Sequence, residues 1–292
     1  MRDVLIALSP AAVAGVVLFG WRALVTILVC VSSAVLSEFL FNIICKKEQT
    51  VGDLSAAVTG LLLALSLPAK VGIWHCIVGS VFAIIVVKCL FGGIGCNFAN
   101  PAITSRVFLL IAFSASIGGA TNTAIGNPEL VATATPLEII KLGSGAELPS
   151  LLDMFLGNRA GAIGETCALA LIIGGIYLIA RRVIKWHVPV IYIATVFVFS
   201  LIIKQDLTVA LYQILGGGLM LSAFFMITDY VTTPINVAGK MVFAFGCGII
   251  TVLIRFWGSY PEGVSFAILI MNILSPYIEK MCEKKPFGKV GK

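Results

Sequence analysis

Hydrophobic residues occur along the chain in ten long runs separated by short polar segments. The runs cover residues 4–19, 23–44, 54–67, 73–90, 103–117, 162–180, 188–203, 215–227, 241–256 and 264–278. A helix that spans a bilayer needs about 20 mostly apolar residues, so each run is a candidate for one membrane crossing. We therefore expect about ten transmembrane helices.

Two of these runs are short and are interrupted by residues that break helices. The third begins after Asp53 and stops at Pro68, whereas the eighth opens with Gly216-Gly217-Gly218 and stops before Thr232-Thr233-Pro234. Interrupted segments are tolerated at membrane depth only where protein or a cavity surrounds them. We expect broken helices at both places.

The interrupted segments occupy corresponding places in the two halves of the chain. Pro68 precedes Phe91-Gly92-Gly93 by about as many residues as Pro234 precedes Phe256-Trp257-Gly258. A duplicated five-span unit explains this spacing, with coincidence as the alternative, and an odd number of spans places the second copy upside down. The predicted fold is an all-α polytopic membrane protein made of two inverted five-helix repeats. Its predicted units are residues 1–117, the loop 118–160, residues 161–280 and a basic tail at 281–292.

The composition agrees with a membrane location and excludes several other classes of protein. Of the 292 residues, 59% are hydrophobic and 12% are charged, and the mean hydropathy is +1.07, whereas about 25% of residues are charged in soluble proteins. This excludes a soluble domain, a disordered chain, a disulfide scaffold and a basic domain that binds nucleic acid. The eight cysteines include no CxxC pair, so we interpret them as buried thiols, with iron–sulfur ligation as the alternative. No other metal site is predicted.

The distribution of basic residues predicts how the chain is oriented. If the N-terminus is cytoplasmic, fourteen Lys and Arg residues fall on the cytoplasmic side and six on the other. Positive charge is enriched in cytoplasmic loops. We therefore predict that both termini are cytoplasmic and that the loop 118–160 lies outside, and a loop of this length is usually functional.

This loop contains the signature of a short, well-capped helix. Thr135 is a candidate N-cap, Pro136 suits the first helical position, Glu138 completes a T-x-x-E capping box, and Gly143 can end the helix. One interpretation is simply a surface helix. The other is that the hydroxyl of Thr135 carries or binds a phosphate, because free N–H groups and the helix dipole favour an anion at a helix start.

Several longer strings resemble one family of membrane proteins. They are Leu148-Pro149-Ser150-Leu151-Leu152-Asp153-Met154-Phe155-Leu156-Gly157-Asn158, Gly164-Glu165-Thr166, Gly174-Gly175-Ile176-Tyr177-Leu178, Phe225-Met226-Ile227-Thr228-Asp229-Tyr230-Val231-Thr232-Thr233-Pro234 and Tyr260-Pro261-Glu262-Gly263-Val264-Ser265-Phe266-Ala267-Ile268-Leu269. With them the chain resembles, over essentially its whole length, the D component of the Rnf-type ion-translocating electron-transport complex. The related family is the B component of the sodium-translocating NADH:quinone reductase.

The resemblance implies a ten-helix flavoprotein with FMN joined covalently by a phosphodiester to a threonine. The family motif is acidic-x-x-[Ser/Thr]-Gly-Ala-Thr, which carries the acceptor over to Thr135, with Ala134 matching and Glu129 in place of the usual aspartate. The sequence departs from this motif at Ala132, where Ser or Thr is usual, and at Thr133, where Gly is usual.

A rival acceptor lies earlier in the same loop. Thr121 ends the triplet Gly119-Ala120-Thr121 and so keeps the glycine of the family motif. It has no acidic residue six positions before it and no helix start after it. We therefore favour Thr135 as the attachment site.

The resemblance also implies partners and a role. The chain would be one subunit, not active alone, of a cell-membrane complex that couples electron transfer between ferredoxin and NAD⁺ to translocation of Na⁺ or H⁺, with FMN as a one-electron relay. Its partners would be the other subunits, including a second flavinylated subunit and iron–sulfur subunits, together with a flavin transferase and the lipid bilayer. A second, non-covalent flavin (riboflavin) is expected in this family, and the turn that contains Asn100 is a candidate for its site, with ordinary turn chemistry as the alternative.

Ionisable residues near the membrane are candidates for function because burying charge is costly. We place Glu165 in the first turn of the sixth predicted span, Asp229 at the end of the eighth, and Glu38 within the second. We assign Glu165 to the flavin pocket or the ion path, and Asp229 and Glu38 to the ion path. Asp53 and Glu262 flank helix starts, where we interpret them as carboxylates that interact with the helix dipole.

Two other functions remain as alternatives from the sequence. The inverted five-span repeat is also the plan of urea-type channels, which predicts a stand-alone channel or transporter for a small solute. A structural anchor for redox partners, with no cofactor of its own, is the second alternative.

Overall fold

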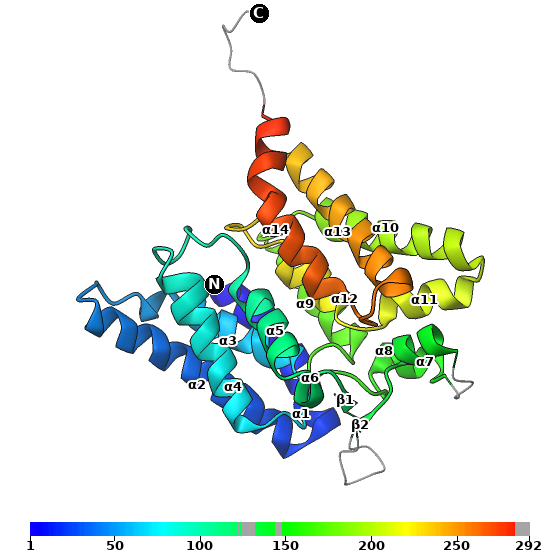
Figure 1. Ribbon diagram of the computed structural model, residues 1–292, viewed down its shortest axis with the longest axis horizontal. Helices are drawn as coiled ribbons and strands as arrows, with labels where there is room; N and C mark the ends of the chain where they lie inside the picture. Colours follow the sequence, from blue (N-terminus) through cyan, green and yellow to red (C-terminus); the bar gives the residue numbers. More distant parts are fainter. Residues whose placement is uncertain (122, 124–131, 144–147, 284–292) are drawn as a thin grey trace, which may run out of the picture.

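The structure, a computed structural model, describes residues 1–121, 123, 132–143 and 148–283. Ten apolar helical segments follow the ten predicted runs in order (Figure 1). They are α1 (Arg2–Phe19), α2 (Trp21–Ile44), α3 (Ser55–Ser66), α4 continued by the π-helix η2 (Ile73–Val81, Phe82–Cys89), α5 (Pro101–Ala112), α9 (Ala168–Ala180), α10 (His187–Lys204), α11 followed by α12 and the π-helix η3 (Leu207–Leu215, Leu219–Leu221, Ser222–Met226), α13 (Val237–Trp257) and α14 (Val264–Met281).

Shorter elements connect these segments. They are η1 (Val51–Asp53), α6 (Ser114–Ile117), β1 (Ala120–Thr121), β2 (Ala132–Thr133), α7 (Pro136–Leu142) and α8 (Leu151–Leu156). The strands β1 and β2 form an antiparallel pair, the only sheet in the described part of the chain, with Ala120 opposite Thr133. The prediction of an all-α polytopic membrane protein is confirmed.

The ten segments differ in their ability to cross a membrane. Five helices (α1, α2, α10, α13 and α14) are long and apolar enough to do so alone, and α11 with α12–η3 forms a sixth candidate that is bent by 61°. The other four (α3, α4–η2, α5 and α9) are apolar but shorter. The chain is thus a multi-pass membrane protein, and the number of ten complete crossings stays a prediction.

The break in the eighth segment lies elsewhere than the sequence suggests. Gly216, Gly217 and Gly218 do not open the segment but divide it, because α11 precedes them and is capped by Asp206, whose carboxylate accepts from the Thr208 N–H at 2.8 Å. Polar side chains such as Gln213 interrupt the apolar pattern over α11, so the hydrophobic run did not predict this helix. The third segment has its predicted bounds, with α3 beginning after Asp53 and ending before Pro68, but α3 is one short continuous helix and does not contain the predicted break.

The two halves of the chain pack in corresponding ways. Helix α2 packs against α3 and α4 in the first half, α10 packs against α11 and α13 in the second, and α1 packs against α9 across the halves. The N-terminus and the end of α14 lie toward one end of the bundle, which we call the tail end, and α7 and α8 lie toward the other, the loop end (Figure 1). One cavity at the tail end is lined by the starts of α1, α3 and α5 and by the end of α9. Corresponding helices such as α1 and α9 therefore run in opposite directions, as an inverted repeat requires, and the repeat itself stays a prediction.

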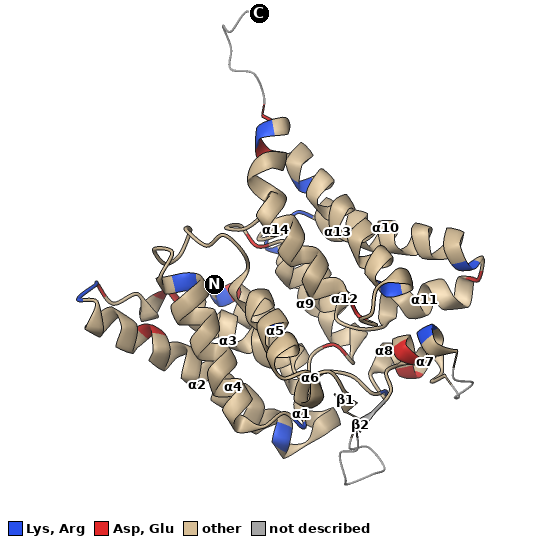
Figure 2. Ribbon diagram, viewed as in Figure 1, with Lys and Arg blue, Asp and Glu red and all other residues tan. Residues whose placement is uncertain are grey.

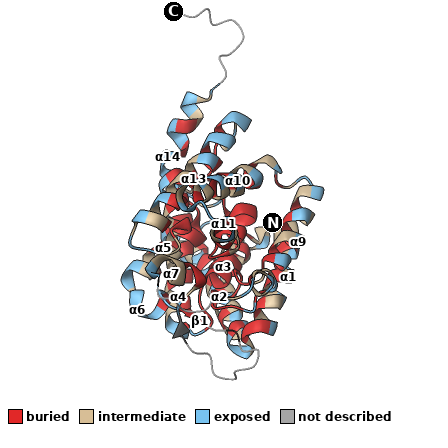
Figure 3. Cartoon of the chain, turned by 90° about the vertical axis from the view of Figure 1, so that its right-hand side faces the viewer, coloured by how far each residue is buried: buried red, intermediate tan, exposed pale blue. Residues whose placement is uncertain are grey.

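A hydrophobic core joins the two halves. Buried residues fill the space between the helices, and the outward faces are exposed (Figure 3). Close contact across the halves needs small residues, as it generally does between membrane helices. Gly174 of α9 lies against the Ala7 carbonyl of α1, so that an added Cβ would collide with it.

Charged residues lie mainly near helix ends and in connecting segments (Figure 2). Glu38, inside α2, is an exception and is buried. All eight cysteines lie among the described residues, where none is in a disulfide, and four of them are buried. The expectation of buried thiols holds for those four, whereas Cys45 and Cys96 are exposed.

Candidate functional site

The predicted capped helix is present at the loop end. Thr135 is the N-cap of α7, and its Oγ1 accepts from the Glu138 N–H at 3.1 Å. The Glu138 carboxylate accepts in return from the Thr135 N–H at 3.4 Å, which completes the capping box. Pro136 occupies the first helical position, and Gly143 ends the helix with a φ of 61°. The prediction from the sequence is confirmed at each of these positions.

The two candidate threonines lie close together in the fold. Thr121 in β1 pairs with Ala132 in β2, and Ala132 lies three residues before Thr135 in the sequence. The Thr121 side chain is buried, at 1% exposure, and its N–H and carbonyl bond to Gly161. Thr135 is half-buried and Ala134 is exposed. The predicted motif residue Glu129 lies outside the described residues.

Helix α7 is held in place by contacts with the second half of the chain. Leu137 packs over the glycine break, where Cβ atoms at Gly216 and Gly217 would lie 2.8 and 3.1 Å from its side chain. Lys141 donates its ammonium group to the carbonyls of Gly258 at 2.6 Å and Tyr260 at 2.9 Å. The break between α11 and α12 therefore lies directly beneath α7, and Gly217 turns there with a φ of 63°.

A small cavity opens beside Thr135. Its volume is about 60 Å³, and its wall includes Ser66 and Pro68 at the end of α3, Arg106 of α5, and Glu165 and Glu262. A cavity of this size holds a few water molecules. The cavity joins the Thr135 segment to the end of α3 and to the break between α11 and α12.

Two carboxylates and one arginine meet at the glycine break. Arg106 donates to Glu262 Oε2 at 2.5 Å, and the N–H of Gly218 donates to Glu262 Oε1 at 2.7 Å. Glu165 Oε1 accepts from the Ala162 N–H at 2.9 Å. Its Oε2 lies 4.0 Å from Arg106 and has no hydrogen-bond partner among the described residues. We call Glu165, Glu262 and Arg106 the carboxylate cluster.

Glu165, Glu262 and Asp53 all lie just before helix starts, and their side-chain contacts differ. Glu165 lies in a buried turn three residues before α9 and not in its first turn. Glu262 lies two residues before α14, and its side chain accepts from Arg106 and the Gly218 N–H; its interaction with the dipole of α14 stays a prediction. Asp53 does act near the start of its helix, α3, where its carboxylate accepts from the Ser55 N–H at 2.6 Å.

Two buried arginines fasten this cluster to the end of α11. Arg159 donates to the carbonyls of Glu165 at 2.7 Å and Leu215 at 2.6 Å. Arg255 donates to the carbonyls of Glu262 at 3.0 Å and Gly216 at 3.1 Å. Each arginine thus ties the backbone of one carboxylate residue to the last turn of α11 and adds a positive charge near the break.

The surroundings shift the pKa values of Glu165 and Glu262 in opposite directions. Burial, followed by the charge of Glu262, raises the pKa of Glu165 to about 7, although Arg106 opposes the shift. Burial also acts to raise the pKa of Glu262, but Arg106 and the Gly218 N–H outweigh it and the pKa of Glu262 is lowered. Near neutral pH, Glu262 is ionised and Glu165 is close to its titration midpoint.

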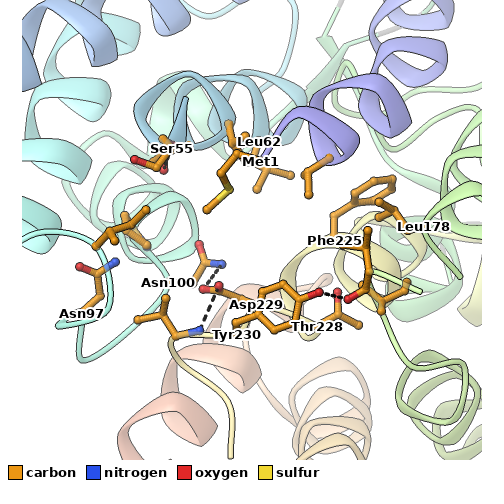
Figure 4. Close-up of a pocket in the computed structure, with 18 of the residues that line it drawn as sticks. Met1, Ser55, Leu62, Asn97, Asn100, Leu178, Phe225, Thr228, Asp229 and Tyr230 are labelled. Carbon is orange, nitrogen blue, oxygen red and sulfur yellow. Dashed lines mark hydrogen bonds between the residues drawn. The ribbon is translucent and has the colours of Figure 1, made fainter. Parts of the chain in front are cut away.

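A second, larger cavity lies at the tail end (Figure 4). Its volume is about 200 Å³, and its wall is mostly apolar, with side chains such as Leu62 and Phe225. Asn100 caps α5 by accepting from the Ala102 N–H at 3.1 Å, and its amide group faces Asp229 Oδ2 at 3.5 Å. The structure therefore brings together two predicted residues, one assigned to a flavin site and one to the ion path.

The third predicted ion-path residue takes part in a buried ion pair beside this cavity. Lys88 donates to Glu38 Oε1 at 2.7 Å, and both side chains are 2% exposed. Thr50 donates to the same oxygen at 2.7 Å, and Lys88 also contacts the Ser55 hydroxyl. Glu38 and Asp229 thus lie near the tail-end cavity, whereas Glu165 lies at the loop end.

Several residues of these sites were not identified from the sequence. They are Lys88, Arg106, Arg159 and Gly218. A basic residue inside or beside an apolar run was a usable signal for Lys88 and Arg106, since such residues need a partner. Their partners are distant in sequence, and the sequence holds no signal for those pairings.

Comparison with known proteins places the chain in a family. The sequence profile described as the NQR2, RnfD, RnfE family matches residues 1–288. The chain is 47% identical to the D component of the "Na(+)-translocating ferredoxin:NAD(+) oxidoreductase complex" of Acetobacterium woodii, over 99% of this chain and 90% of that protein.

Two further relatives align over a similar share of their length. One is the D component of the "Proton-translocating ferredoxin:NAD(+) oxidoreductase complex" of Clostridium ljungdahlii, 38% identical over 99% of this chain and 91% of the relative. The other is the D component of the "Ion-translocating oxidoreductase complex" of Stutzerimonas stutzeri, 35% identical over 99% of this chain and 91% of the relative.

Proposed function

The chain belongs to the NQR2, RnfD, RnfE family, and on this premise we propose that it is the D component of an ion-translocating ferredoxin:NAD⁺ oxidoreductase complex. Full-length similarity to three proteins named as D components of such complexes carries the proposal. The protein works in the cell membrane with the other subunits of the complex, among them a second flavinylated subunit and iron–sulfur subunits. Because one relative is named for Na⁺ and another for protons, both ions remain candidates.

Within the complex, we assign covalent FMN to Thr135. In the capping box the Thr135 oxygen is an acceptor, so its hydroxyl proton takes no part in either bond of the box. Replacing that proton by a phosphoester leaves the capping role of the oxygen in place. Thr135 is half-buried with exposed Ala134 beside it, whereas Thr121 is buried and inaccessible to a flavin transferase. These contrasts favour Thr135 over Thr121.

The residues beside Thr135 fit a flavin at the surface better than one inside the protein. The cavity of about 60 Å³ is too small for a flavin ring system, so only an edge enters it. Arg106 also lines this cavity, where it is paired with Glu262. When bound, FMN supplies one-electron transfer. The chain's own residues would position the flavin and keep one face of it open to partner subunits.

Covalent attachment is tested by in-gel fluorescence of the full chain, made with its transferase. Wild type should show a fluorescent band that is lost in Thr135→Val and kept in Thr121→Val. Mass spectrometry of the peptide covering residues 107–141, with fragmentation between the two threonines, should place the added mass on Thr135. A fluorescent band in Thr135→Val would overturn the assignment.

A second, non-covalent flavin is proposed for the tail-end cavity. The apolar wall suits the benzenoid part of a flavin, and Asn100 offers polar contacts for the imide edge. Lys88 is already paired with Glu38, which favours an uncharged flavin such as riboflavin over a phosphorylated one. Leu62→Trp should fill the cavity and release non-covalent flavin, while the exposed control Leu152→Trp retains it. Retention in Leu62→Trp would refute the site.

The stand-alone channel makes a different prediction. It requires solute flux from the isolated chain in liposomes and no bound flavin.

For the complex we propose instead that both termini face the cytoplasm and that loop 118–160 faces outward. Glu38 and Asp229 then serve the ion path from the cytoplasmic side, and Glu165 serves it near the covalent flavin.

A further inference from the structure

We propose that Glu165 and Glu262 together bind one exchangeable proton at the glycine break beneath α7, and that this proton balances charge on a group attached to Thr135. The proton site itself involves only described residues. Its link to Thr135 rests on the proposed function, because it needs a redox group there.

Among the described residues, Oε2 of Glu165 accepts no hydrogen bond, and it lies beside Glu262, whose two oxygens both accept one. Glu262 uses both oxygens, one for Arg106 and one for the Gly218 N–H. Among the described residues Glu165 accepts a hydrogen bond through Oε1 only, although the residue is only 6% exposed. A Cβ on Gly218 would lie 2.7 Å from Glu262 Oε1 and 3.1 Å from Glu165 Oε2, so both carboxylates reach the same face of that glycine. A proton on Glu165 Oε2 satisfies the unpartnered oxygen and is donated toward Glu262.

The surrounding charges explain why one proton is bound and not two. Arg106 of α5, Arg159 from the segment before α9, and Arg255 of α13 face the pair. Arg106 and the Gly218 N–H both stabilise ionised Glu262. Glu165 has a single backbone donor, and its burial and the neighbouring charge of Glu262 both favour its protonated form. The proton therefore resides on Glu165.

The small cavity and the nearby charges let the proton on Glu165 respond to an electron added near Thr135. Glu165 and Glu262 line the small cavity that Thr135 also lines, and the cavity has room for water. An electron added near Thr135 introduces one negative charge next to the cluster. Where Glu165 is ionised, it then takes one proton, delivered from bulk solvent through water in the cavity, forming an O–H bond at Oε2, and the net charge is restored. When the electron leaves for a partner, Glu165 returns the proton to water.

The first experiment omits the flavin and tests the proton site alone. In the full chain carrying Thr135→Val, infrared spectra recorded across a pH titration should show a carboxylic-acid band that fades as pH rises through neutrality. Glu165→Gln, which has nearly the same shape, should remove the band, and Glu262→Gln should move its midpoint to lower pH because a negative neighbour is lost. Glu48→Gln, an exposed control, should leave the band unchanged. Persistence of the band in Glu165→Gln would overturn the site.

The second experiment tests the link to the redox group. Protons taken up per electron during reduction near neutral pH are measured with a pH dye in the flavin-loaded protein. Uptake should fall in Glu165→Gln and match wild type in Glu48→Gln. Equal uptake in wild type and Glu165→Gln would refute the link. Absence of flavin from Thr135 would instead refute the proposed attachment, and the infrared result would still decide the proton site.

Discussion

Lys88 and Glu38 form an ion pair 2.7 Å long, although they lie 50 positions apart in the sequence and both side chains are almost completely buried. The pair joins the end of η2 to α2 beside the tail-end cavity. A buried charge that loses its partner is costly, whereas an apolar replacement of the whole pair is often tolerated.

Single and double substitutions at this pair should therefore differ in their effect. Lys88→Met should lower the free energy of unfolding by about 3–5 kcal/mol, because it leaves Glu38 buried without a cation. The double variant Lys88→Met with Glu38→Leu should recover most of that loss. Thermal unfolding of the purified chain in detergent measures both. A double variant as unstable as the single one would contradict the pairing.

Gly218 should be intolerant of a side chain. A methyl group there would lie 2.7 Å from Glu262 Oε1, so Gly218→Ala should destabilise the protein by about 1–3 kcal/mol. Gly52 is the matched control, since a Cβ there meets nothing within 4 Å. Thermal unfolding of Gly218→Ala and Gly52→Ala should show a clear loss only for the first. Equal stabilities would mean that the glycine break is looser than described.

The capping role of Thr135 can be separated from its proposed chemical role. Thr135→Val removes the oxygen that accepts from the Glu138 N–H and should cost about 1 kcal/mol of local stability. Thr135→Ser keeps that oxygen and should preserve the cap. Hydrogen exchange of the α7 amides measures the difference and should rise only in the valine variant. Unchanged exchange in Thr135→Val would show that contacts of Leu137 and Lys141 alone hold the helix.

Stability should depend on pH through Glu165. Its pKa in the folded protein, about 7, lies above the ordinary value of 4.5, so the folded state binds the proton more tightly than the unfolded state. The stabilising contribution is fully present below pH 4.5 and is lost as pH rises through 7. Glu165→Gln has no titrating carboxyl at this position, so its free energy of unfolding does not include this pH-dependent loss. The unfolding temperature of the variant relative to wild type should therefore increase across this interval, and a constant difference would contradict the shift.

The proposed orientation can be tested with existing cysteines. Cys45 and Cys96 are exposed and lie in connections at the tail end, after α2 and η2. In right-side-out vesicles a membrane-impermeant thiol reagent should spare them and label Leu152→Cys, whose parent side chain is 73% exposed in α8. Inverted vesicles should show the reverse pattern. Labelling of Cys45 from outside would reverse the assigned topology.

Local features of the fold could be predicted from the sequence, and distant pairings could not. Apolar runs located the ten segments, and the capping box and Gly143 predicted the start and the end of α7, because these signals depend on neighbouring residues. The α11 part of the eighth segment was missed, since Asp206 and Gln213 interrupt its hydrophobicity. The carboxylate cluster brings Arg106 to residues 59 and 156 positions away, a meeting that only the packed helices create.

The attachments of α7 and its neighbouring segment have a consequence for electron delivery. Lys141 fixes the end of α7 to the connection between α13 and α14, and Tyr212 donates to the Pro149 carbonyl at 2.5 Å, which fixes the chain ahead of α8 to α11. A prosthetic group on Thr135 would thus be mounted on a rigid platform and would not swing between donor and acceptor as a tethered arm does. The distance that electrons must cover would then be set by movements of the partner subunits, and the pace of turnover would be controlled by their docking.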